Sequence, residues 1–131
     1  MTISQRFIIR NEIDIISTRM AVREFARRYG FNSRDQACIS LASSSLASSL
    51  GLGKESAFVG LEILIEYFEN GQKKGMRVVC TKQRAETNDW AAVGRLKNSY
   101  LLVDDIQMKL VSQNGIEVTV TKWNSSYVGI G

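Results

Sequence analysis

The sequence predicts an α+β domain, a two-layer sandwich in which helices cover one face of a mixed or antiparallel sheet. Two segments with helical periodicity lie between Asn11 and Leu50, and apolar residues alternate with polar ones in several segments after residue 58. Glycine-containing turns join those alternating segments, which is typical of β-hairpins. A chain of 131 residues can bury a core, so residues 1–131 are expected to form one domain of order β-α-α-β-β-α-β-β.

The chain is predicted to begin with a strand and a helix. Residues 2–10 hold Phe7, Ile8 and Ile9 between polar residues and are expected to form the strand. Asn11 is expected to cap a helix that runs to about Tyr29, with Asp14 near the positive end of its dipole. Three arginines recur four residues apart on one face of this helix: Arg19, Arg23 and Arg27. Phosphate binding is conceivable for such a row, but a solvated face is the simpler interpretation.

A serine-rich helix over residues 33–50 is the segment around which the fold is organised. Ser33 and Gln36 have the spacing of a capping box. One stripe is expected to pack on the strands at 58–68 and 76–82: Ile39, Ala42, Leu46 and Leu50. The adjacent stripe is less apolar: Cys38, Leu41, Ser45 and Ser49. Serine is a mediocre helix former, so either close packing or the loss of larger functional side chains explains its abundance.

A hairpin and a third helix are predicted next. The hairpin pairs residues 58–68 with residues 76–81 through a turn at 70–75. A polar loop at 83–89 then leads to a helix from Trp90 or Ala91 to Val103.

The last part of the chain is predicted to form a second hairpin. Residues 106–110 and 116–120 alternate apolar and polar side chains around a tight Asn114–Gly115 turn. Residues 124–131 are expected to fray.

The composition excludes several kinds of chemistry. The chain has no histidine, which excludes histidine general bases, histidine zinc sites and phosphohistidine relays. No apolar run approaches the roughly 20 residues that span a bilayer, and no signal peptide is expected at the start. Cys38 and Cys80 do not make a disulfide framework, so a reducing cytoplasm is expected. The net charge of +4 gives a mild preference for anionic partners.

Several short motifs occur in a fixed order between Asn11 and Trp123. They are Asn11–Ile15, the junction of Tyr29–Phe31 with Asp35–Ala37, the Gly71–Gly75 turn before Val78–Val79, the Gly115–Val118 hairpin and the closing Lys122–Trp123. In this order they resemble the serine-kinase, anti-sigma regulatory branch of the histidine-kinase-like (GHKL) ATPase superfamily. The resemblance covers nearly the whole chain and implies the Bergerat-type nucleotide-binding fold.

The resemblance also indicates where the nucleotide site should lie, and the chain departs from the family there. The family's second helix carries a glutamate that acts as base and an asparagine that holds magnesium, and here those positions are Ser45 and Ser49. The family's Asp-x-Gly-x-Gly motif, whose aspartate accepts the adenine amino group, falls on three other residues: Lys82, Arg84 and Glu86. Lysine only donates hydrogen bonds, so it offers adenine no acceptor. The glycine-rich phosphate lid has no counterpart in residues 88–95, which contain only Gly94 as a glycine.

We therefore expect a catalytically degenerate regulatory protein with no catalytic residue, cofactor or metal. It would act through protein–protein binding in a partner-switching pathway, without a membrane. The resemblance implies a STAS-domain or sigma-factor-type partner, and a homodimer is also open. The candidate partner surface is the row of Arg19, Arg23 and Arg27.

Two alternatives belong to other functional classes. The first is an active ATP-dependent serine kinase of a STAS-domain protein, which would use ATP and magnesium. The second is an anion or nucleic-acid binding module that uses a basic stretch without acidic residues: Lys73, Lys74, Arg77, Lys82 and Arg84. No aromatic residue is interleaved along that stretch, which argues against nucleic acid.

Overall fold

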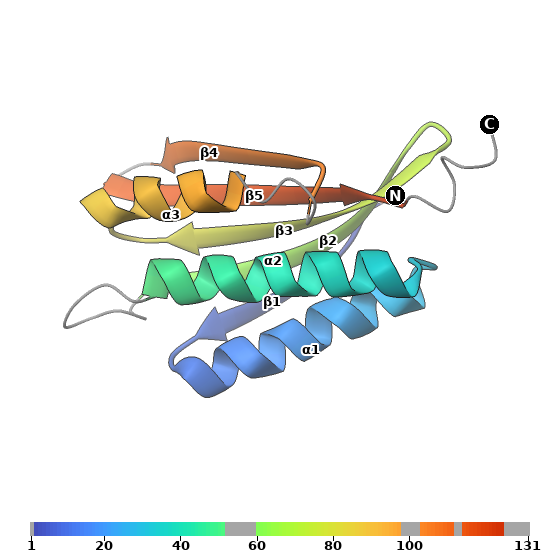
Figure 1. The fold of residues 1–131 in the computed structure, drawn as a ribbon, viewed down its shortest axis with the longest axis horizontal. Coiled ribbons are helices and arrows are strands. Elements are labelled where there is room, and N and C mark those ends of the chain that lie inside the picture. Colours follow the sequence, from blue (N-terminus) through green and yellow to red (C-terminus); the bar gives the residue numbers. More distant parts are fainter. Residues whose placement is uncertain (1, 52–59, 98–102, 112–113, 125–131) are drawn as a thin grey trace.

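The elements follow the predicted order. The computed structural model describes residues 2–51, 60–97, 103–111 and 114–124 (Figure 1). Along the chain these form β1 (Thr2–Ile9), α1 (Glu12–Arg28), α2 (Ser33–Gly51), β2 (Leu61–Asn70), β3 (Lys73–Lys82), α3 (Thr87–Lys97), β4 (Asp105–Val111) and β5 (Gly115–Trp123). In the described part of the chain, no helix is both long and apolar enough to cross a membrane.

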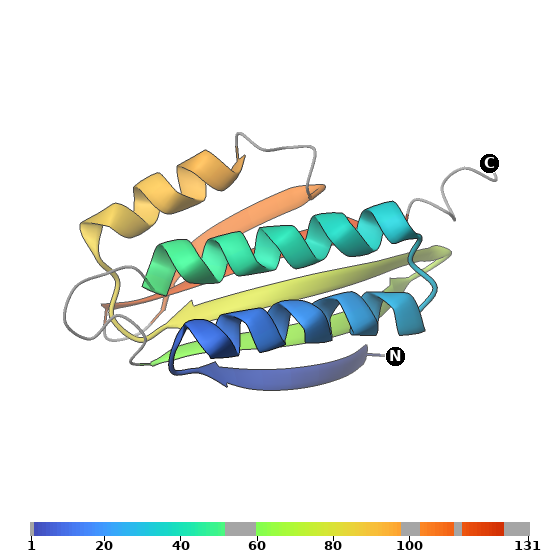
Figure 2. The ribbon, with the colours of Figure 1, turned by 60° about the horizontal axis from the view of Figure 1, so that its bottom comes forward.

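The sheet has five strands in the order β1-β2-β3-β5-β4, and every neighbouring pair is antiparallel. All three helices lie on the same face of this sheet (Figure 2). The predicted α+β two-layer sandwich is therefore confirmed. Because β5 pairs with both β3 and β4, the last hairpin extends the sheet beyond the first one.

The core lies between the sheet and α2. The predicted stripe of α2 is fully buried: Ile39, Ala42, Leu46 and Leu50. Strands β2, β3 and β5 bury alternate residues beneath the helices, as a sheet with one covered face requires. Helix α2, which carries this stripe, lies closest to β5 and β3, whereas the sequence predicted that the stripe packs on β2 and β3. The reason is that β5 lies next to β3, which shifts the centre of the sheet away from β2.

The helix termini confirm one predicted cap and correct another. Asn11 Oδ1 accepts the Asp14 amide N–H at 2.9 Å, and the Asp14 carboxylate accepts the Arg10 N–H at 2.8 Å. The cap of α2 is Asn32, whose side-chain oxygen accepts the Asp35 N–H at 2.8 Å. The predicted capping box beginning at Ser33 was therefore wrong by one residue, since asparagine competes equally well for the position.

Two predicted boundaries were also wrong. The first is the turn predicted at residues 70–75. Strand β2 ends at Asn70 and β3 begins at Lys73, so only Gly71 and Gln72 connect the two strands, and Gly71 has a φ of +66°. Helix α3 begins at Thr87, inside the predicted loop at 83–89. Its predicted C-terminal part falls on residues 98–102, which lie outside the described residues, as do residues 58 and 59 of the predicted β2 strand.

The end of the chain is ordered further than predicted. Asn114 has a φ of +70° next to Gly115, which confirms the predicted turn position. Asn124 is buried, and its amide N–H donates to the Lys74 carbonyl at 2.9 Å while its side chain donates to the Gly30 carbonyl at 3.2 Å. The prediction that fraying starts at Asn124 was therefore wrong at that residue, and residues 125–131 lie outside the described part.

Neither Cys38 nor Cys80 forms a disulfide, and the two thiols lie in different environments, which gives a first testable prediction. Burial raises the pKa of the Cys80 thiol from 9.0 to about 12, while Cys38 is partly exposed. A thiol reagent such as Ellman's reagent should therefore label only Cys38 in the native protein and both thiols in denaturant. Because the folded-state pKa of Cys80 is raised, its contribution to stability is complete below pH 9 and falls as the pH approaches 12. Rapid native labelling of a Cys38→Ser variant would contradict the burial of Cys80.

Candidate functional site

A buried ion pair occupies the end of β3, where the resemblance places the adenine site. Lys82 is the last residue of β3 and only 4% exposed. Its Nζ lies 3.0 Å from Asp89 Oδ1, 3.3 Å from Asp89 Oδ2 and 3.4 Å from Glu86 Oε1. These contacts connect the end of the strand to the first turn of α3.

The carboxylate of Asp89 is held from two sides. It is 2% exposed, and its Oδ2 also accepts the backbone N–H of Glu86 at 2.6 Å. The Asp89 N–H in turn donates to the Glu86 carbonyl at 3.0 Å, so Asp89, in the first turn of α3, helps to cap this helix through Glu86. A negative charge in the first turn of a helix also interacts favourably with the helix dipole. The Lys82–Asp89 ion pair is therefore both hydrogen-bonded and electrostatically supported.

The structure brings together some of the predicted site residues and separates others. Lys82 and Glu86 form an ion pair, as expected for a lysine that needs an acidic partner there. Arg84 is exposed and forms no ion pair with any described residue. Asp89 is not among the predicted site residues, because residues 83–89 were predicted to form a loop. An acidic residue in a first helical turn is the signal that a correct helix boundary would have provided.

The serines of α2 divide into two groups. Ser40, Ser43 and Ser44 donate to carbonyls three or four residues earlier in the helix, at 2.6–3.1 Å. Their hydroxyl groups are thus satisfied by the helix itself, which favours close packing as the reason for small residues there. Ser45 is exposed and Ser49 is half-buried, and neither hydroxyl is hydrogen-bonded to a described residue.

The described residues contain no cluster of three or more acidic, cysteine or histidine side chains that could hold a metal ion. Neither Ser45 nor Ser49 therefore has a carboxylate cluster beside it to complete a magnesium site in the described part of the chain.

The predicted basic stretch does not form one surface. Lys73 and Lys82 stand at opposite ends of β3, and Lys82 is buried. Arg77 pairs with Glu66 at 3.2 Å. In space, two aromatic rings do lie among these cations, since Lys73 Nζ is 5.5 Å from the Trp123 ring and Arg77 lies 4.2 Å from another ring, that of Phe68. The lack of aromatic residues along the stretch is therefore not a valid argument against nucleic-acid binding. A better argument is that the basic side chains are dispersed and that Arg77 and Lys82 are paired with acidic residues.

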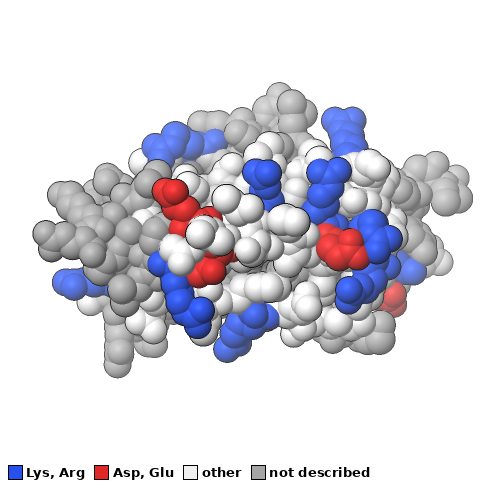
Figure 3. All heavy atoms as spheres, turned by 90° about the horizontal axis from the view of Figure 1, so that it is seen from below, with Lys and Arg blue, Asp and Glu red and all other residues white. Residues whose placement is uncertain are grey.

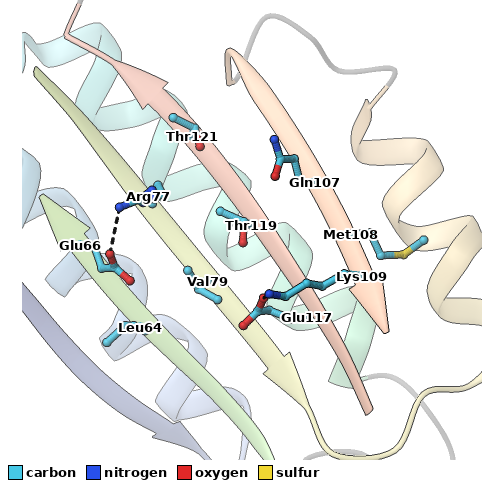
Figure 4. A pocket seen from close by; sticks show the side chains of 10 residues that line it. All are labelled: Leu64, Glu66, Arg77, Val79, Gln107, Met108, Lys109, Glu117, Thr119 and Thr121. Carbon is cyan, nitrogen blue, oxygen red and sulfur yellow. Dashed lines mark hydrogen bonds and ion pairs between the residues drawn. The ribbon is translucent and has the colours of Figure 1, made fainter. Parts of the chain in front are cut away.

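A hollow of about 470 Å³ lies on the face of the sheet opposite the helices (Figure 4). Its charged lining residues are paired with each other, Arg77 with Glu66 at 3.2 Å and Lys109 with Glu117 at 3.1 Å. The hollow is thus separate from the Lys82–Asp89 ion pair and offers no uncompensated charge to a ligand.

Comparison with known proteins identifies one curated relative and a structural neighbour. No protein-family model matches the chain. It is 28% identical over 127 residues to the serine/threonine-protein kinase RsbT of Bacillus subtilis strain 168, a match that covers 88% of this chain and 92% of the kinase. A crystal structure of the RsbU and RsbW domains of a Mycobacterium tuberculosis protein matches 92% of this chain with a TM-score of 0.64 and 17% identity.

The structural match concerns the fold alone, because the two sequences are only 17% identical. The chain spans about a third of the mycobacterial protein. The relation to RsbT extends over nearly the full length of both proteins. The element order, the antiparallel sheet covered on one face and these two likenesses agree with the motifs found in the sequence. The resemblance of the chain to the serine-kinase, anti-sigma regulatory branch of the GHKL ATPase superfamily is therefore confirmed by its similarity to RsbT.

Proposed function

We propose that the protein is a catalytically degenerate regulator that binds a protein partner without using ATP. The Lys82–Asp89 ion pair is the observation that carries this proposal. It lies where members of the family are expected to present an aspartate to the adenine amino group. In this chain the strand presents an ammonium group that is already bonded to two carboxylates.

The residues of the site do not fit ATP and magnesium. The adenine amino group donates hydrogen bonds and so does Lys82, so the two groups cannot bond to each other. Freeing Asp89 to accept from adenine would leave the Lys82 charge buried without its main partner, at a cost of about 3–5 kcal/mol. The hydroxyl groups of Ser45 and Ser49 provide neither a good general base nor a strong magnesium ligand.

Helix α3 supports the same proposal. Residues 88–95, where the family has a glycine-rich lid, lie within this helix, and its first turn is tied to β3 through Asp89. Val93 and Leu96 are buried, so α3 contributes to the core. A helix held in this way replaces a loop that would have to wrap around phosphates.

We infer a partner of the STAS-domain or sigma-factor type, in a partner-switching pathway of the cytoplasm. The family and the two free thiols support this inference. The test measures binding of this protein, by biolayer interferometry, to each STAS-domain and sigma-factor protein encoded in the same genome. We expect at least one to bind with an affinity that ATP and magnesium do not change. Binding that requires ATP would contradict the proposal and favour the active serine kinase, the alternative that the relation to RsbT supports.

A designed variant provides a further prediction about the site. The variant restores the aspartate and the first glycine of the Asp-x-Gly-x-Gly motif through Lys82→Asp and Arg84→Gly. Because Lys82→Asp alone would place two carboxylates together in a buried position, Asp89→Asn is added to remove one of them. We expect the folded triple variant to bind no ATP, because the Ser45 and Ser49 positions and the missing lid still prevent it. Isothermal titration calorimetry with ATP and magnesium measures this, after circular dichroism has verified the fold. Saturable binding gained by the variant would show that an acceptor at residue 82 suffices.

A further inference from the structure

The outer face of α1 exposes three large apolar side chains. Ile13 is 71% exposed, Ile16 56% and Met20 67%. Their spacing of three and four residues places them in one line along the helix, about 10 Å long at 1.5 Å per residue. The buried side of α1 is formed by other residues, including Ile15, Val22 and Phe25, so the exposed line contributes nothing to the core.

Unpaired arginines accompany this apolar line. Helix α1 contains four arginines and no lysine. Arg27 is bonded to Glu24 at 2.6 and 2.8 Å, whereas Arg19 and Arg23 are exposed and form no ion pair with any residue that the structure describes. Arginine and methionine are enriched at protein interfaces and lysine is depleted there. Seen from the side of α1, the molecule has a central surface without charge that is bordered by basic and acidic groups (Figure 3).

We propose that this face of α1 binds an amphipathic helix of a partner protein, whose apolar stripe is flanked by aspartate or glutamate. This inference rests on the proposed function, since it specifies how the regulatory partner is recognised. An exposed apolar line at positions i, i+3 and i+7 is the pattern by which helices dock against each other. Carboxylates beside the partner's apolar stripe would pair with Arg19 and Arg23 in the geometry that guanidinium groups favour.

Charge selects this occupant over a membrane or a second copy of the chain. Acidic residues stand on α1 itself, with Glu12 and Asp14 in its first turn and Glu24 among the arginines, and the exposed apolar line has no aromatic residue. Membrane-surface helices instead combine a cationic face with aromatic and large aliphatic anchors. A second copy would present the same helix, on which Glu24 is already bonded to Arg27, so its arginines outnumber the acidic side chains left to pair with them.

The experiment uses two fluorescein-labelled synthetic helices of about 18 residues with identical leucine stripes at heptad spacing. Glutamate flanks the stripe in one and lysine in the other. Fluorescence anisotropy measures their binding to the parent, to Ile16→Ser/Met20→Ser and to Arg19→Glu/Arg23→Glu. Matched controls are Leu110→Ser, which removes a leucine that is 65% exposed on β4, and Arg6→Glu, which reverses an exposed arginine on β1.

We expect the glutamate peptide to bind the parent saturably and at least about tenfold more weakly to each α1 variant, with no change in either control. Equal affinity for both peptides, equal losses in the controls, or no binding at all would overturn the proposal. Two further outcomes would also overturn the proposal: binding of the parent to phosphatidylglycerol vesicles in a sedimentation assay, and a dimer of the parent in sedimentation velocity. Each counts against it if the Ile16→Ser/Met20→Ser variant no longer shows that behaviour. Adding ATP and magnesium separates the two claims: an effect of nucleotide on the parent refutes the proposed function and leaves the α1 surface standing.

Discussion

Replacing Leu46 with aspartate is expected to unfold the domain. Leu46 is 1% exposed and lies in the middle of the stripe with which α2 covers the sheet. An aspartate there would place an unpaired charge in an apolar core, which costs at least about 4 kcal/mol. Because the free energy of unfolding of a small domain is only about 5–15 kcal/mol, the Leu46→Asp substitution removes a large part of it.

Thermal denaturation followed by circular dichroism measures the effect of Leu46→Asp. The matched control is Leu41→Asp, which makes the same substitution in the same helix at a leucine that is 46% exposed. The control is expected to melt close to the parent. A Leu46→Asp protein that melts within a degree or two of the parent would mean that α2 does not pack through this stripe.

Removing the carboxylate of Asp89 is expected to have the second-largest effect. In Asp89→Ala the buried ammonium of Lys82 keeps, among the residues that the structure describes, only Glu86 as an ionic partner, and the Glu86 side chain is partly exposed. Breaking a buried ion pair by deleting one partner costs about 3–5 kcal/mol, and lost capping of α3 adds about 1 kcal/mol. Urea denaturation should show this loss as a lower midpoint.

A double-mutant cycle separates the ion pair from its surroundings. Lys82→Met combined with Asp89→Leu removes both charges while retaining apolar volume. We expect the double variant to be more stable than Asp89→Ala, because no buried charge remains without a partner. If Lys82→Met and Asp89→Leu instead destabilise additively, the two side chains are not coupled and the account of the site is wrong.

Local signals predicted most of the fold. Alternation and helical periodicity gave the element order, and the α2 stripe was assigned to the core correctly, because these patterns depend on residues close in sequence. The position of β5 between β3 and β4 depends on long-range pairing, so the sequence predicted β3 correctly as a strand beneath α2 but predicted β2 in place of β5. Asn32 was missed as a cap because its neighbour Ser33 is an equally good candidate.

The site was predicted less completely. Lys82 and Glu86 were found through the resemblance. Asp89 was not, because the predicted start of α3, at Trp90 or Ala91, is three or four residues later than the observed start at Thr87. The exposed apolar line of α1 was not predicted from the sequence, because isoleucines occur on both the buried and the exposed side of that helix. In sequence Ile13, Ile15 and Ile16 look alike, and only the packed helix shows that the middle one is buried while its neighbours are exposed.

Calorimetric titration of the unmodified protein with ATP and magnesium tests the central claim most directly. The claim is that the Lys82–Asp89 ion pair and the serine positions leave no functional nucleotide site. The account predicts no saturable heat, even at millimolar ATP, from protein that is folded and binds its partner. Saturable binding with a micromolar dissociation constant would contradict it and would show that the protein binds nucleotide as the family that it resembles does.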